Sequence, residues 1–441
     1  MGSRLSPLDS AFLQVEDAEN RMQLAGMLLF RGEAPDFGEF RDAVAERLLG
    51  LPRFQQRLAG SVFGLRRPKW TDDDAFALDY HVSRVALPAP GGRVEDAALI
   101  DQLTSSPLDL RRPLWEVGLV EGLEGGFAIS LKVHHCMVDG LSIIDIFTAL
   151  LAPDSELPTP AAAARAATPA QPTPAIAGLP AKVVRSSVSG LLSAARLVGQ
   201  APASPFNTGR SGPTRRTDYV TVPLDDIHRV RHAYGTTVNN AVLAVVAGGL
   251  RRYLERHDVD TDTMHAFVPV NRRADGARGS LGNQIAMTYP ALPVGEPDRD
   301  LRVRKVIDAV RQTAESGQAA ATSSLVSLLG LAPAPIAGTL NRVMQFHSGL
   351  FNLTVTNVPG PPVPVHFLGR QLELIVGSTP LTRQHAVTIA VLSYNGTLTF
   401  MVTSDPSRIP DGTSLAADLE AELAELVEDA QGTRRGKGKE S

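Results

Sequence analysis

The stretch FAISLKVHHCMVDGLSIIDIFTALL, residues 127–151, decides the fold of this chain. Apolar side chains stand at every second position from Phe127 to Val133, which is the pattern of a half-buried β-strand. Continuing this alternation places His135 on the apolar face and His134 on the opposite, more polar face. The strand therefore predicts one imidazole that points into the interior.

A turn and a helix follow the predicted strand. Asp139 and Gly140 end it, since glycine permits a sharp turn, and Leu141 begins an apolar helical stripe that stops before Pro153. An inward imidazole just before such a turn can act as a general base, because its unperturbed pKa lies near neutrality. A lone inward histidine is more often a hydrogen-bonded core residue, so the strand alone leaves both interpretations open.

Metal binding and thiol chemistry are disfavoured in this stretch. Adjacent histidines on a strand point to opposite faces and cannot readily chelate one zinc ion. Cys136 is the only cysteine, and His135 is badly placed to deprotonate it because neighbours along a strand diverge. We expect Cys136 to be a small buried hydrophobic residue. The aspartates 72–74 fit an exposed acidic turn better than a metal site, and we expect neither a metal nor another cofactor.

Length and composition limit the class of protein. A chain of 441 residues that is 43% hydrophobic can bury a large core, most simply as two domains. A net charge of −4 argues against a general nucleic-acid binder, and a single cysteine fits a reducing cytoplasm. The first 20 residues lack the apolar segment of a signal peptide, and no apolar run is long enough to span a membrane. We expect a protein that is soluble or peripherally bound to a membrane.

The chain divides into four regions by pattern. We expect an N-terminal lobe over residues 1–152, a linker over 153–216, a C-terminal lobe over 217–431 and a disordered tail over 432–441. Within the linker, residues 176–200 form a basic amphipathic pattern that could lie on an anionic membrane or pack as a crossover helix. The dipeptide Asn395-Gly396 predicts a hairpin turn.

The motif HHCMVDG at 134–140 resembles the active-site motif of the superfamily that includes chloramphenicol acetyltransferase, carnitine acyltransferases and peptide-synthetase condensation domains. Further motifs narrow the resemblance to the bacterial wax ester synthase/diacylglycerol acyltransferase family. These are SPLDSAFL at 6–13, PLWE at 113–116, VNNAVLAVVAGGLRRYL, VPVNRR, LGNQ, TNVPGP and SYNGTL. The resemblance covers most of the chain outside the linker and tail.

The resemblance implies two mixed α/β lobes, each like chloramphenicol acetyltransferase, with a tunnel between them. His135 is implied to be the general base where acyl-CoA and a hydroxyl acceptor meet, without an acyl-enzyme. His134 is implied to be secondary. Asp139 is implied to support the motif by pairing with an arginine, for which Arg273 is our candidate.

The same family motifs suggest which residues line the substrate path. We assign Trp115, Gly140, Asn239, Asn240, Asn283, Asn357, Pro359 and Gly360 to it. Trp115 also fits the core, and on the sequence alone that is the better interpretation. Asn283 and backbone N–H groups past the motif are candidate donors to the oxyanion. Asn240 departs from the family, which usually has an aspartate there, and this bears on acceptor choice or activity level.

The function implied is esterification of diacylglycerol or a long-chain alcohol by a long-chain acyl-CoA at a membrane or lipid-droplet surface in the cytoplasm. Two alternatives stay open: acylation of a polyketide or other lipid-like alcohol, and a non-catalytic lipid-binding relative. The intact motif argues against the second alternative. A condensation domain is disfavoured because no carrier domain accompanies the chain.

Overall fold

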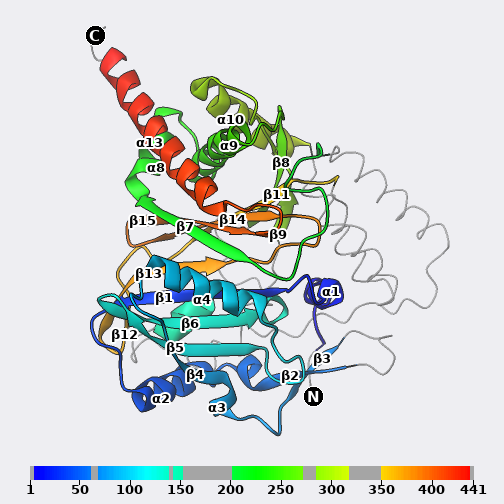
Figure 1. Cartoon of the computed structure of the whole chain (residues 1–441), viewed down its shortest axis with the longest axis vertical. Helices are drawn as coiled ribbons and strands as arrows, with labels where there is room; N and C mark the ends of the chain where they lie inside the picture. Colours follow the sequence, from blue (N-terminus) through cyan, green and yellow to red (C-terminus); the bar gives the residue numbers. More distant parts are fainter. Residues whose placement is uncertain are drawn as a thin grey trace, which may run out of the picture.

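The computed structural model describes residues 4–60, 68–138, 143–151, 201–271, 285–316 and 349–437. Two β-sheets form its framework, and helices pack on both of them (Figure 1). The predicted class, mixed α/β with two lobes, is confirmed. The expected linker helix at 176–200 lies outside the described residues.

The first sheet has the strand order β12-β13-β1-β6-β5-β4. Its strands are β1 (Gln23–Arg31), β4 (Val82–Ala86), β5 (Trp115–Leu123), β6 (Gly126–His134), β12 (His366–Phe367) and β13 (Arg370–Ser378). In β6 eight of nine residues are buried and in β1 six of nine, because helices and the second sheet cover the faces of this sheet. This burial includes the more polar face of β6, where Lys132 is only 2% exposed.

Helices of the N-terminal half surround this sheet. They are α1 (Pro7–Val15), α2 (Phe37–Leu48), α3 (Leu78–His81), α4 (Arg93–Ser105) and α5 (Ile143–Leu151), with the 3₁₀ turns η1 (Pro52–Gln55) and η3 (His135–Val138). A small hairpin of β2 (Gln56–Ala59) and β3 (Lys69–Asp72) lies at one end. The helix α4 is packed between the first sheet and strand β7 of the second (Figure 1).

The second sheet has the order β10-β8-β11-β14-β15-β7, and β9 pairs with β8. Its strands are β7 (Arg216–Pro223), β8 (Met264–Asn271), β9 (Ile285–Thr288), β10 (Ala291–Leu292), β11 (Leu353–Pro359), β14 (Val387–Tyr394) and β15 (Thr397–Ser404). Its outer face carries α8 (Leu224–Ala233), α9 (Val238–Arg256), α10 (Arg299–Glu315) and α13 (Gly412–Lys437) (Figure 1). A buried ion pair at 2.6 Å joins Arg302 of α10 to Glu422 of α13.

Both halves of the sequence contribute to the first sheet and to the apolar cluster that packs on it. Strand β13 pairs with β1 antiparallel, so a segment from the expected C-terminal lobe completes the N-terminal sheet. Ala390 and Met401 of the second sheet belong to the same apolar cluster as Leu131 of β6. A boundary drawn along the sequence thus separates segments that the strand pairing joins.

Local patterns in the sequence agree well with the structure. Asn395 and Gly396 have φ values of 43° and 82° at the tip of the β14–β15 hairpin, as the predicted turn requires. Thr237 is the N-cap of α9, and its side chain accepts a hydrogen bond from the backbone N–H of Asn240. The predicted start of the disordered tail at residue 432 is wrong, because α13 continues to Lys437 and each added residue gains a backbone hydrogen bond; residues 438–441 lie outside the described part of the chain.

Candidate active site

His135 lies where strand β6 ends and the turn η3 begins. The strand stops at His134, one residue earlier than the alternation predicts, so η3 rather than the strand aims the second imidazole. The backbone N–H of His135 donates to the carbonyl of Met22 at 2.8 Å. Its ring stacks on Phe12 of α1 with centroids 3.9 Å apart and planes at 25°. The residue is therefore held at its backbone by the Met22 carbonyl and at its ring face by Phe12.

The surroundings of His135 keep its imidazole neutral. Burial and, to a smaller extent, the neighbouring His134 lower its pKa from 6.5 to about 4. The residue is half-buried, so some of its surface still reaches solvent. A neutral imidazole can accept a proton, which is the state that a general base needs.

His134 is fully buried and both of its ring nitrogens are engaged. Its Nδ1 accepts a hydrogen bond from the backbone N–H of Cys136 at 3.1 Å. Because an amide N–H only donates, Nδ1 carries no proton, and the ring proton must be on Nε2. That nitrogen lies 2.9 Å from Oε2 of Glu16. His134 therefore supports the turn and has no free nitrogen for substrate chemistry.

Cys136 is fully buried, as the sequence predicted. Burial raises the pKa of its thiol well above the ordinary value, and the nearby carboxylates of Asp9 and Glu16 raise it further. The thiol therefore stays protonated at neutral pH and offers no nucleophilic thiolate.

The segment 12–22 holds the two histidines in place, and this contact was not predicted from the sequence. It supplies Phe12 to the ring of His135, Glu16 to His134 and the Met22 carbonyl to the backbone. Glu16 is only 11% exposed at its side chain. A buried carboxylate needs a partner, but nothing in the local pattern identifies one that is 118 residues away.

Trp115 lies in the core of the first lobe. It has no exposed surface, its indole N–H donates to the Phe54 carbonyl at 2.8 Å, and its ring stacks on His81 with centroids 4.6 Å apart. With its polar group satisfied and its surface covered, it supports the fold of the motif. This arrangement favours the core interpretation of Trp115 over its assignment to the substrate path.

The asparagine and glycine positions of the second lobe lie on two elements. Asn239 and Asn240 are half-buried in the first turn of α9, and the Asn240 side-chain amide donates to Oγ1 of Thr236 at 2.9 Å. Asn357 and Pro359 are in β11, paired with β14. Within the described part of the chain, none of these four residues forms a hydrogen bond or a ring contact with His135.

Gly360 has a structural role beside β14. Its N–H donates to the Ser393 carbonyl at 2.9 Å, and a Cβ at this position would overlap that same carbonyl oxygen. The remaining site candidates Asp139, Gly140, Arg273 and Asn283 lie outside the described residues.

An apolar cavity of about 90 Å³ lies between the two sheets. One wall comes from β1, β6, β13 and α5, and the other from β11, β14 and β15. Gly26 and Gly377 face each other across β1 and β13 in one wall, and Ala390 and Met401 stand in the other. Leu131, on the strand that ends beside His135, also lines the cavity. Small side chains and glycines leave this space open.

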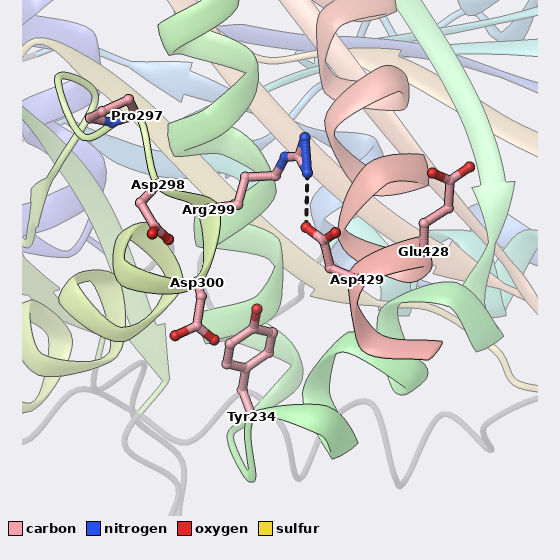
Figure 2. A pocket seen from close by; sticks show the side chains of 7 residues that line it. All are labelled: Tyr234, Pro297, Asp298, Arg299, Asp300, Glu428 and Asp429. Atoms are coloured by element: carbon pink, nitrogen blue, oxygen red, sulfur yellow. Dashed lines mark hydrogen bonds and ion pairs between the residues drawn. The ribbon is translucent and has the colours of Figure 1, made fainter. Parts of the chain in front are cut away.

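A second hollow, of about 650 Å³, lies on the outer face of the C-terminal half. Figure 2 shows its lining side chains, contributed by α8, α10, α13 and the residues around them: Tyr234, Pro297, Asp298, Arg299, Asp300, Glu428 and Asp429. Arg299 and Asp429 form an ion pair at 2.8 Å across it. Its charged lining does not suit an apolar substrate, and the helices that form it lie on the far side of the second sheet from α1 (Figure 1).

Two kinds of feature are absent from the part of the chain that the structure describes. There, no cluster of three or more His, Cys, Asp or Glu side chains could hold a metal ion. No described helix is both long enough and apolar enough to cross a membrane.

A neutral histidine is thus held at the end of a central strand whose Leu131 lines an apolar cavity between two sheets, an arrangement that suits acyl transfer. The N-terminal part, residues 5–242, matches the model of the wax ester synthase/diacylglycerol acyltransferase catalytic domain, and residues 281–427 match the WS/DGAT C-terminal domain. The chain belongs to the wax ester synthase/diacylglycerol acyltransferase family.

Individual relatives agree with this assignment. A Mycobacterium tuberculosis H37Rv protein named probable diacylglycerol O-acyltransferase tgs1 is 31% identical over 446 residues, which cover 96% of each chain. The solved wax ester synthase/diacylglycerol acyltransferase from Marinobacter aquaeolei VT8 is 27% identical with a TM-score of 0.74, over 97% of this chain and 100% of that one.

A more distant structure shares the fold alone. The first condensation domain of the calcium-dependent antibiotic synthetase has a TM-score of 0.63 at 19% identity, over 98% of this chain and 96% of that one. The resemblance stated from the sequence motifs is thus confirmed at the level of both family and fold.

Proposed function

We propose that this acyltransferase moves the acyl group of a long-chain acyl-CoA onto the free hydroxyl of diacylglycerol, with His135 as general base. The observation that carries the proposal is the His135 imidazole, which is neutral, stacked on Phe12 and fixed at the end of the strand that also lines the apolar cavity. The relatives named as diacylglycerol acyltransferases support this choice of acceptor.

The reaction needs one proton acceptor and no covalent intermediate. The free ring nitrogen of His135 takes the hydroxyl proton while the oxygen attacks the thioester carbonyl carbon. When the tetrahedral intermediate collapses, its carbon–sulfur bond breaks, and the imidazolium returns the proton to the CoA thiolate. The imidazole is neutral again, and ester and free thiol are the products. Cys136 is buried and protonated, which disfavours a route through a thioester on the enzyme. Acyl-CoA is a cosubstrate, and no further cofactor is required.

The cavity between the sheets suits the acyl chain. Its lining side chains are mostly apolar, and burying each methylene there contributes about 0.8 kcal/mol. Leu131 stands four positions before His135, which along a strand corresponds to roughly 13 Å. An acyl chain whose thioester lies at His135 can therefore extend along β6 into the cavity.

Wax ester synthesis is the second candidate activity, because the matched solved structure carries both activities in its name. A long-chain alcohol offers the same reacting group as diacylglycerol, a hydroxyl attached to an apolar chain. Peripheral association with a membrane or lipid droplet on the cytoplasmic side follows from the insolubility of either acceptor, and it too remains a proposal.

Product analysis tests the proposal directly. The purified protein is incubated with a long-chain acyl-CoA and either diacylglycerol or a long-chain alcohol, and the lipids are separated by chromatography. We expect triacylglycerol, with or without wax ester, and one thiol released for each ester formed. Thiol release only with another lipid-like alcohol would replace diacylglycerol as the acceptor. No release with any alcohol would indicate a lipid-binding relative without activity.

A further inference from the structure

We propose that Glu16 is a positioning residue that holds the backbone on both sides of His135, partly through His134, and that the C-terminal half of the chain holds Glu16 in place. The proposal rests on the proposed role of His135 as general base. It adds to that role the means by which the imidazole is aimed.

The two oxygens of Glu16 serve two different groups. Oε2 lies 2.9 Å from Nε2 of His134, and Oε1 accepts a longer hydrogen bond, 3.4 Å, from the backbone N–H of Met22. Because Nδ1 of His134 accepts from the Cys136 amide, Nε2 must carry the ring proton and donate it to Glu16. A carboxylate is the partner that fixes this tautomer.

Met22 and His134, the two partners of Glu16, each hold one peptide unit beside His135. The Met22 carbonyl accepts from the His135 N–H at 2.8 Å, which fixes the peptide before the catalytic residue. Nδ1 of His134 accepts from the Cys136 N–H at 3.1 Å, which fixes the peptide after it. Glu16 contacts both supports, so one side chain controls the backbone orientation of His135 from two directions.

The loop that carries Glu16 is tied to the C-terminal lobe and to the segment that leads into it. Arg383 forms an ion pair with Asp17, and the buried guanidinium of Arg215 donates to the Glu19 carbonyl at 2.6 Å. Within the loop, the Asn20 side-chain amide donates to the Val15 carbonyl at 2.8 Å. The position of Glu16 therefore depends on contacts between the two halves of the chain as well as on its own segment.

Kinetics of the full-length protein separate positioning from folding. We expect Glu16→Ala to lower kcat by about 10- to 100-fold while KM for acyl-CoA changes by less than about threefold, because a misaimed base impairs chemistry and not binding. Glu16→Gln keeps one acceptor for His134 and should recover most of kcat. The matched control is Glu121→Ala, which removes a carboxylate on β5 that is paired with Arg84 of β4 and should leave kcat unchanged. A Glu16→Ala protein with a parental melting temperature and full kcat would overturn the proposal.

A spectroscopic measurement tests the same idea without turnover. In the ¹⁵N NMR spectrum of the parent, His134 should be the neutral tautomer with its proton on Nε2, and that proton should exchange faster with solvent in Glu16→Ala. An imidazolium, or a proton on Nδ1, would overturn the proposal whatever the activity. If instead His135→Ala is as active as the parent, the proposed function fails, and the tautomer result still decides whether Glu16 holds His134.

Discussion

Replacing Ala390 by leucine should shorten the acyl chains that the protein accepts. Ala390 is 6% exposed, stands on β14 and lines the apolar cavity, where it faces the wall formed by β1 and β13. Leucine adds three carbons to a space of about 90 Å³. The added side chain occupies volume that the end of a long acyl chain would otherwise fill.

The size of the effect follows from the apolar contact that is lost. At about 0.8 kcal/mol for each methylene, a chain that loses three buried methylenes binds its transition state less well by roughly 2.4 kcal/mol. This corresponds to a fall of about 60-fold in kcat/KM for long-chain acyl-CoA. A chain too short to reach the cavity should lose less than about threefold, so the preference for chain length inverts.

The assay measures thiol release over a series of acyl-CoA chain lengths, with diacylglycerol as acceptor. Ile389→Leu is the matched control, since Ile389 is on the same strand but packs into the core of the other face. Thermal unfolding detects overpacking, which costs about 1–3 kcal/mol when a side chain exceeds its space. A folded Ala390→Leu protein with the same loss at every chain length would refute the assignment of this cavity to the acyl chain.

Three further predictions concern pH, the α9 N-terminus and the linker. Because the pKa of His135 is lowered to about 4, the imidazole stays neutral as the pH falls through 6.5, and kcat/KM should decline only near pH 4; a decline centred near 6.5 would contradict this environment. Asn240→Asp places a carboxylate in the first turn of α9, favourable by about 0.3–1 kcal/mol, so the melting temperature should be equal or slightly higher and turnover should stay within about tenfold. A hundredfold loss would show that the amide itself is needed. Changing Lys182, Arg185 and Arg196 to glutamate should weaken flotation with anionic liposomes, whereas unchanged flotation would favour a packed crossover helix.

Features set by neighbours in the sequence were predictable. The strand β6, the cap at Thr237 and the turn at Asn395-Gly396 each depend on a few adjacent residues, and the structure has all three, although β6 ends one residue early and is buried on both faces. The thiol of Cys136 is also buried, in the turn η3 that directly follows this strand.

Features set by distant pairing were not predictable from one sequence. The pairing of β13 with β1 joins segments from opposite ends of the chain, and nothing local specifies that partner. The contact between Glu16 and His134 spans 118 residues, and the exit of His135 from the strand depends on the turn that this contact supports. Long-range hydrogen bonds thus define the part of the site that the motif alone leaves open.

The initial rate of thiol release by His135→Ala tests the central claim most directly. With long-chain acyl-CoA and diacylglycerol, the account predicts a rate at least about a hundredfold below that of the parent, with an unchanged melting temperature, because the general base is gone. Cys136→Ala, which alters the neighbouring buried thiol, should keep most of the parental rate. An active His135→Ala protein beside an inactive but folded Cys136→Ala protein would contradict the mechanism.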